Sequence, residues 1–165
     1  MKINIKYLPN KLSKKDRNNQ AKMLKKSQKL YRKGIYYTRK KLPSFKSIKS
    51  PHVLKAMKIY KVDKIGATNE LAKATGCSKK ALAKIINKGE GAYYSSGSRP
   101  NQTGQSWGIA RLASAITSGK AAAIDYTILE KGCRPTAKAM TLAKKAKKKY
   151  GRGTRKIKKT EYSIK

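Results

Sequence analysis

The chain has 165 residues, enough for one modest hydrophobic core, and carries 43 Lys and Arg against 7 Asp and Glu, a formal charge of +36. The seven acids are too scattered in the sequence for a paired-carboxylate catalytic site to be proposed. No run of about 18 apolar residues occurs, so we expect no membrane span.

The positive charge is uneven and divides the sequence into three predicted parts. Residues 1–61 hold 20 basic residues against one acid, residues 62–133 hold 10 against 5, and residues 134–165 hold 13 against one. Like charges at this density repel one another and oppose compaction. We therefore predict a helical core domain between a basic N-terminal arm with short helices and a basic C-terminal helix and tail, and we expect the arms to need an acidic partner.

The N-terminal part shows one strand pattern and two helix starts. Residues 2–8 alternate between polar and apolar types, which predicts a short strand that must pair with another chain or element. Ser13 is a predicted N-cap for a helix that runs to about Arg32. Ser50 followed by Pro51 predicts the start of a second helix, because proline is favoured at the first helical position.

Residues 68–89 carry the most specific local pattern. They predict two short helices, the first capped by Thr68 or Asn69 and the second by Ser78, joined at Gly76, which supplies the positive φ of the turn. This spacing is typical of a helix-turn-helix, although a plain αα-hairpin in a small helical core explains the same residues. Three lysines of the second helix are expected to point outward and to suit phosphates better than base edges: Lys79, Lys80 and Lys84.

The sequence from residue 89 onward predicts a long loop followed by helices. Residues 89–104 are rich in turn formers, and we expect a loop there. Helices are predicted from Gln105 to Gly119, over 120–131 and over 136–150. The predicted fold class is therefore mainly α: a helix-turn-helix-like hairpin plus C-terminal helices, with extended basic arms at both ends.

The sequence offers no catalytic constellation. Cys77 and Cys133 lie far apart without a CxxC pattern, so we expect two reduced, buried thiols of an intracellular protein rather than a disulfide or a metal site. His52 has no evident nucleophile partner. The glycines of 89–97 match neither common phosphate-binding loop. We expect no enzyme activity, no cofactor and no bound metal.

Aromatic and basic residues are interleaved through much of the chain. Such mixtures suit single-stranded nucleic acid, and they suit protein interfaces equally. The residues that we predict to bind a protein or nucleic-acid partner are Tyr36, Tyr37, Arg39, Lys79, Lys80, Lys84, Tyr93, Tyr94, Arg99, Trp107 and Arg111.

Residues 31–133 resemble a domain family of large nucleocytoplasmic DNA viruses, the group that includes the chlorella viruses. The segments that carry the resemblance are YRKGIYYTRK at 31–40, KVDKI at 61–65, LAKATGC at 71–77, GAYYSSGSRPNQT at 91–103, SWG at 106–108, ARLASA at 110–115 and GKAAA at 119–123. The resemblance implies a viral origin and a virion component. It carries no known catalytic residues.

Two functions compete at this point. The first is a structural one: a minor capsid protein, cement or scaffold, on the inner face of a large icosahedral capsid, made in the host cell interior. Its extended arms would bind neighbouring capsid proteins, with nucleic acid as a further partner. The alternative is a helix-turn-helix-type protein that binds or packages DNA.

Overall fold

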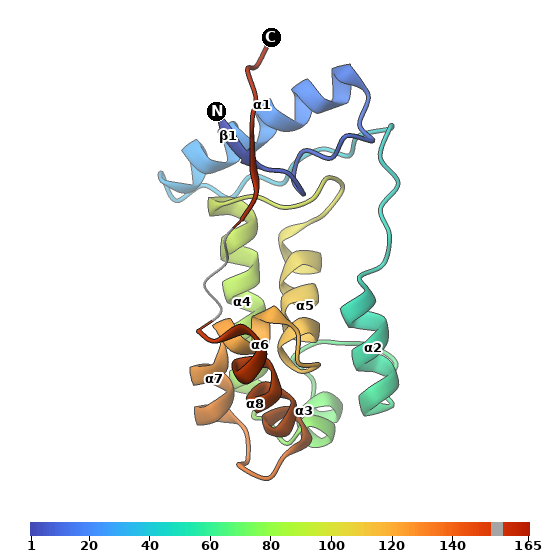
Figure 1. Cartoon of the computed structure of the whole chain (residues 1–165), viewed down its shortest axis with the longest axis vertical. Coiled ribbons are helices and arrows are strands. Elements are labelled where there is room, and N and C mark those ends of the chain that lie inside the picture. The colour runs from blue at the N-terminus through green and yellow to red at the C-terminus, as the bar shows by residue number, and fades with distance from the viewer. Residues whose placement is uncertain (153–156) are drawn as a thin grey trace. The chain divides into compact units, whose positions relative to one another are not determined.

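The computed structural model describes residues 1–152 and 157–165 (Figure 1). The helices in these residues are α1 (Lys14–Tyr31), α2 (Pro51–Tyr60), α3 (Asn69–Thr75), α4 (Lys79–Ser95), α5 (Gly104–Ala115), α6 (Lys120–Ile124), α7 (Tyr126–Gly132) and α8 (Lys138–Tyr150). Two short strands, β1 (Lys2–Asn4) and β2 (Lys159–Glu161), form an antiparallel pair in which Ile3 lies opposite Thr160. The predicted mainly α fold class is confirmed.

The chain packs as two compact units, each with its own core. Unit 1 comprises Met1–Ile48, Glu90–Trp107 and the described part of residues 156–165, and unit 2 comprises Lys49–Gly89 and the described part of residues 108–155. These units cut across the three ranges that charge suggested.

Unit 1 gathers both ends of the chain around α1. Its buried apolar residues are Ile3, Leu8, Leu12, Ala21, Leu24 and Leu42. The predicted strand β1 pairs with β2 of the same chain. Next to the paired residues, the Ile5 amide donates to the Lys158 carbonyl and the Tyr162 amide donates to the Met1 carbonyl. The basic flanks therefore carry regular structure of their own.

The predicted starts of α1, α2 and α3 are confirmed, and side-chain caps mark two of them. The Ser13 hydroxyl accepts a hydrogen bond from the Asp16 amide at 3.2 Å. The Thr68 hydroxyl accepts one from the Leu71 amide at 3.1 Å. Helix α2 begins at Pro51, as its sequence predicts.

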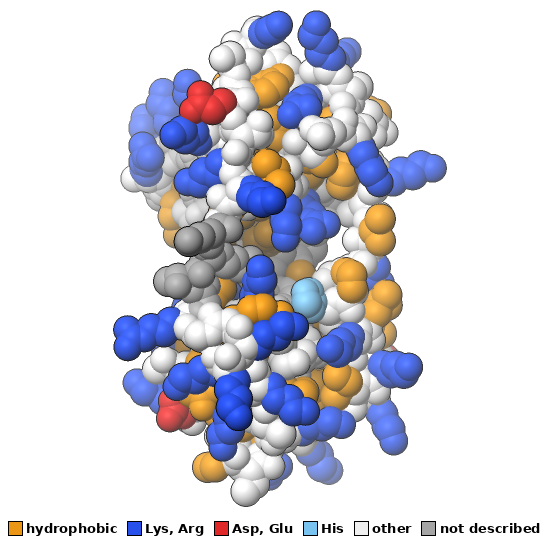
Figure 2. Space-filling view, viewed as in Figure 1, with side chains coloured by type: hydrophobic (Ala, Val, Ile, Leu, Met, Phe, Trp, Pro, Cys, Tyr) orange, Lys and Arg blue, Asp and Glu red, His pale blue; other side chains and the backbone are white. Residues whose placement is uncertain are grey.

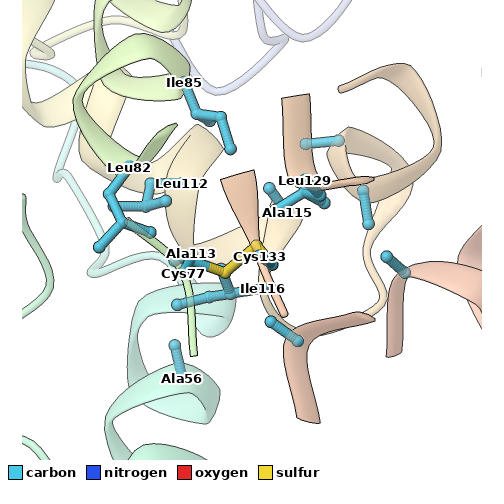
Figure 3. Packing of buried hydrophobic residues seen from close by; sticks show 14 of the residues in the cluster. Ala56, Cys77, Leu82, Ile85, Leu112, Ala113, Ala115, Ile116, Leu129 and Cys133 are labelled. Atoms are coloured by element: carbon cyan, nitrogen blue, oxygen red, sulfur yellow. A yellow bond between two sulfur atoms is a disulfide. The ribbon is translucent and has the colours of Figure 1, made fainter. Parts of the chain in front are cut away.

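Unit 2 has the larger core, seen from close by in Figure 3. Leu82 and Ile85 of α4 and Leu112 of α5 are fully buried there, together with Leu129 of α7. Several alanines fill the remaining space, which lets helices α6 and α8 approach closely. The Tyr60 hydroxyl donates to the Ile116 carbonyl at 2.6 Å, and its burial raises the pKa of this phenol.

Helix α4 is longer than the sequence suggests. It continues through Gly89 to Ser95, where we predicted a loop from residue 89. A Cβ at Gly89 would lie 2.6 Å from the Gly108 Cα of α5, so this glycine serves a close helix approach rather than a stop. The connection between α4 and α5 is correspondingly short.

The predicted helix over 120–131 is two helices that meet at Asp125. The Asp125 amide still donates to the Ala121 carbonyl, but its carboxylate turns toward cations of unit 2 instead of capping α7. The break coincides with this buried ion pair, which the local pattern does not reveal.

Candidate nucleic-acid interface

Helices α3 and α4 form the predicted helix-turn-helix-like pair. They are joined by three residues, of which Gly76 has φ +74°, and the Ser78 hydroxyl accepts a hydrogen bond from the Ala81 amide at 3.1 Å. Leu71 and Leu82 are fully buried in the unit 2 core. Both the helix-turn-helix and the αα-hairpin interpretation share this packing, so the exposed side chains must distinguish them.

The first turns of α4 present an uncompensated group of positive charges. Lys79, Lys80 and Lys84 are exposed, and α4 has no acid in its first turn. Lys80 and Lys84 lie four residues apart, on one stripe of the helix. The N-terminal end of a helix also carries partial positive charge and favours anions. This end of α4 is therefore suited to phosphate groups.

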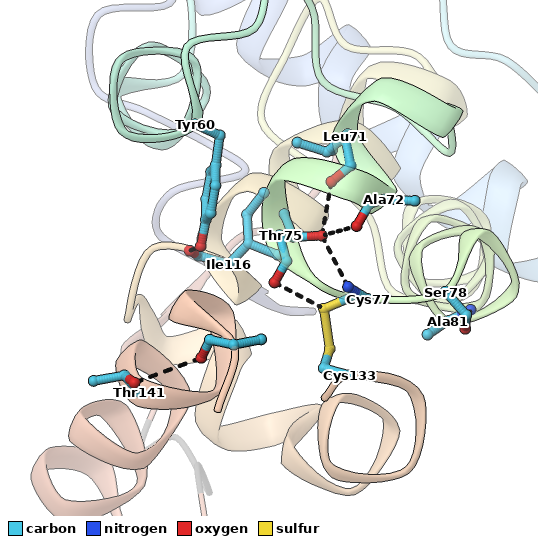
Figure 4. Close-up of a disulfide and its surroundings, with 11 residues drawn as sticks. Tyr60, Leu71, Ala72, Thr75, Cys77, Ser78, Ala81, Ile116, Cys133 and Thr141 are labelled. Atoms are coloured by element: carbon cyan, nitrogen blue, oxygen red, sulfur yellow. Dashed lines mark hydrogen bonds between the residues drawn. A yellow bond between two sulfur atoms is a disulfide. The ribbon is translucent and has the colours of Figure 1, made fainter. Parts of the chain in front are cut away.

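A disulfide fixes the turn between α3 and α4. Cys77 and Cys133 are bonded across 56 residues, so the expectation of two reduced thiols is wrong (Figure 4). The Thr75 hydroxyl donates to the Leu71 carbonyl at 2.8 Å and accepts from the Cys77 amide at 3.3 Å. The large separation of the two cysteines in the sequence does not indicate that the end of α7 lies against this turn.

Backbone contacts pin the same turn on both sides of the disulfide. The Ser78 amide donates to the Gly132 carbonyl at 2.8 Å, and the Arg134 amide donates to the Gly76 carbonyl at 2.9 Å. A Cβ at Gly76 would lie 2.6 Å from the Ala137 Cβ, so only glycine fits there. The turn is held rigidly before any partner arrives.

More positive charge surrounds the turn. A shallow hollow of about 680 Å³ is bordered by the disulfide and by Lys73, Lys131 and Arg134. On the face of the molecule in Figure 2, Lys and Arg side chains are widespread, with few acidic side chains among them. The turn therefore has cationic side chains of α3 and α7 beside it, in addition to the lysines of α4.

Two of the predicted partner residues are internal to unit 1. Arg39 is 7 % exposed, and its guanidinium donates to Ser27 Oγ (3.1 Å), to the Tyr93 carbonyl (3.0 Å) and to Ser98 Oγ (2.8 Å). It lies 3.8 Å from the centroid of the fully buried Tyr93 ring. Burial lowers the pKa of Arg39 and raises that of Tyr93. Both predictions of partner contact are corrected, because these side chains face inward.

Arg111 is likewise committed within unit 2. Its guanidinium binds the buried Asp125 carboxylate through Nε (2.7 Å) and Nη2 (2.8 Å), and Lys88 Nζ lies 3.0 Å from the same carboxylate. A bidentate pair of this kind orients and neutralises the carboxylate. We correct the prediction for Arg111 to an internal structural role.

The remaining predicted residues lie in unit 1 at different degrees of exposure. Tyr36 is 69 % exposed, and its ring packs against those of Tyr31 and Tyr94 at centroid distances of 6.0 and 5.1 Å. Trp107 is half-buried, edge-on to Tyr7 at 6.1 Å.

Tyr37 and Arg99 complete the predicted set. The half-buried ring of Tyr37 lies under the Lys26 ammonium, and Arg99 is exposed. Of the whole predicted set, three members gather at one exposed place, the α4 lysines.

Chemistry beyond charge is sparse in the described part of the chain. No three His, Cys, Asp or Glu side chains gather there in a way that suits a metal ion. None of its helices combines the length and the apolar character that a bilayer crossing requires.

Comparison with known proteins places the chain in a family without assigning it an activity. No curated protein and no solved structure matches it. Residues 5–130 match the model of a family of unknown function, DUF5824. The match covers well over half of the sequence, so the chain belongs to the DUF5824 family.

Proposed function

We propose that this protein is a non-catalytic DNA-binding protein whose α3–α4 pair contacts the phosphate backbone of duplex DNA. The observation that carries the proposal is the acid-free lysine group at the start of α4, next to a turn held by a disulfide. Lysines placed on a helix N-terminus suit phosphates as point charges and carry no base preference by themselves. Binding is therefore expected to be largely independent of sequence and strongly dependent on salt.

A triple variant with a matched control tests this surface. The variant K79Q/K80Q/K84Q removes three charges from α4, and K144Q/K145Q/K149Q removes three exposed charges with the same spacing from α8. Affinity for a 20-base-pair duplex is measured by fluorescence anisotropy at about 0.2 M salt. We expect the α4 variant to lose about one to two orders of magnitude in affinity and the α8 variant to lose far less. Equal losses in both variants would refute the assignment to α4.

The disulfide favours a second, compatible function as a structural component of a virus particle. Disulfides persist in oxidising surroundings and are rare in the cytosol, and a particle released from its host meets such surroundings. The resemblance to a family of large DNA viruses points to the same setting. Because β1 is already paired with β2 of the same chain, a neighbouring capsid protein is expected to contact the side chains of the basic flanks.

The particle role predicts a fixed stoichiometry. In purified particles opened and treated with nuclease, the protein is expected to stay with the capsid shell at a constant ratio to the major capsid protein. Complete release of the protein together with the digested DNA would contradict the capsid role and would be consistent with DNA binding alone.

A further inference from the structure

Unit 1 contains a second cationic surface, a groove between α1 and the extended segment that follows it. The groove has a volume of about 890 Å³. Its charged lining consists of Lys15, Lys22, Lys26, Lys40, Lys41 and one acid, Asp16. In the sequence, only the spacing of the α1 lysines gives a signal for this groove, and it marks one of the two walls.

The first wall is a row of lysines along α1. Lys15, Lys22 and Lys26 are seven and four residues apart, which places them on one face of the helix. At 1.5 Å per residue the row spans about 16 Å. That length matches about five residues of extended peptide at roughly 3.3 Å each.

The opposite wall is held in place before anything binds. The Ser44 amide donates to Asp16 Oδ2 at 2.9 Å, and the Ser13 amide donates to Ser44 Oγ at 3.0 Å. Asn101 accepts from the Leu42 amide at 2.7 Å and donates to the Leu42 carbonyl at 3.1 Å. The lysines at 40 and 41 therefore sit on a fixed segment.

The negative charge of Asp16 is already engaged. Its side chain is buried, and hydrogen bonds from Ser44 lower the pKa of its carboxyl group. Among the described residues that line the groove, the lysines thus face no competing exposed carboxylate.

The uncharged lining combines polar side chains, Ser13, Asn19 and Ser44, with an apolar part that is largely aliphatic. Met23, Leu42 and Pro43 line the groove with Tyr37, whose ring lies 4.7 Å from Lys26 Nζ. Bases of single-stranded nucleic acid need open aromatic faces on which to stack, and this ring carries an ammonium over one face. Aliphatic side chains of a peptide find a suitable surface instead.

We propose that this groove binds an extended acidic peptide segment of a protein partner, in which carboxylates alternate with apolar residues. Side chains of an extended strand point alternately to opposite sides. One set pairs with the lysine rows, and the other packs on the apolar floor. The proposal is independent of DNA binding by α4 and concerns a different ligand and a different unit.

The test uses the full-length protein and a fluorescein-labelled eight-residue peptide of alternating Glu and Leu. K22E/K26E reverses two groove charges, and K25E/K29E makes the same change on α1 outside the groove. At about 0.15 M salt we expect the groove variant to weaken peptide binding at least tenfold and the control variant less than threefold. An oligothymidine of eight nucleotides is expected to lose affinity equally in both variants.

Two outcomes would overturn the proposal. Equal weakening of the peptide by both variants would mean that net charge alone attracts it. Groove-dependent binding of the oligothymidine, with no such dependence for the peptide, would assign the groove to single-stranded nucleic acid. Thermal unfolding of both variants, followed by circular dichroism, verifies that each is folded.

Discussion

Arg39 illustrates how the surroundings of one residue change its role. Its neighbours in sequence, Lys40 and Lys41, are exposed, whereas Arg39 is enclosed by groups 12, 54 and 59 residues away. Composition indicated a surface charge, because basic residues surround it in the sequence. No local pattern indicates the ring and the hydroxyl groups that enclose Arg39. Its internal role could therefore not be predicted from the sequence.

The buried guanidinium is expected to stabilise unit 1. Arg39→Met keeps an unbranched side chain but leaves the Ser27 and Ser98 hydroxyls and a carbonyl without their donor, which should lower the free energy of unfolding by about 3 kcal/mol. Urea unfolding followed by circular dichroism measures this change. The exposed Arg99→Met serves as the control and should cost less than about 0.5 kcal/mol. A loss no larger than that of the control would contradict the structural role.

Among the elements, the starts of the first four helices were predictable, whereas the end of α4 and the break between α6 and α7 were not. A cap involves residues within one turn, so Ser13, Thr68 and Ser78 were recognisable from the sequence. Helix α4 continues past Gly89 where α5 packs closely against it, and the break at Asp125 coincides with an ion pair to Arg111, so both features involve residues distant in sequence. The disulfide likewise joins two residues that are far apart in the sequence, so no local pattern predicts it.

The disulfide should stabilise unit 2 chiefly by restricting its unfolded state. Closing a loop across 56 residues corresponds to about 4 kcal/mol in the chain-entropy model. We expect C77S/C133S to lose about that much in urea unfolding, and the wild type to fall to the same value when a strong reductant is present. If reductant leaves the wild-type transition unchanged while mass spectrometry shows two free thiols, the disulfide has no such role.

At the scale of the whole molecule, the charge of +36 makes weak attraction to any polyanion certain, so affinity alone says little. What distinguishes one surface from another is the arrangement of lysines on rigid elements. In unit 2 that arrangement is the start of α4, and in unit 1 it is the groove along α1. The overall charge and the mainly α class were evident from the sequence, whereas the division into two units was not.

The salt dependence of duplex binding tests the central claim most directly. For each protein the logarithm of the binding constant is plotted against the logarithm of the salt concentration, and the slope reports the number of phosphates neutralised, at about 0.9 per contact. Relative to wild type, we predict that the slope of K79Q/K80Q/K84Q falls in magnitude by about 2.7 and that of K144Q/K145Q/K149Q stays unchanged. An unchanged slope for the α4 variant would show that these lysines do not contact the DNA backbone.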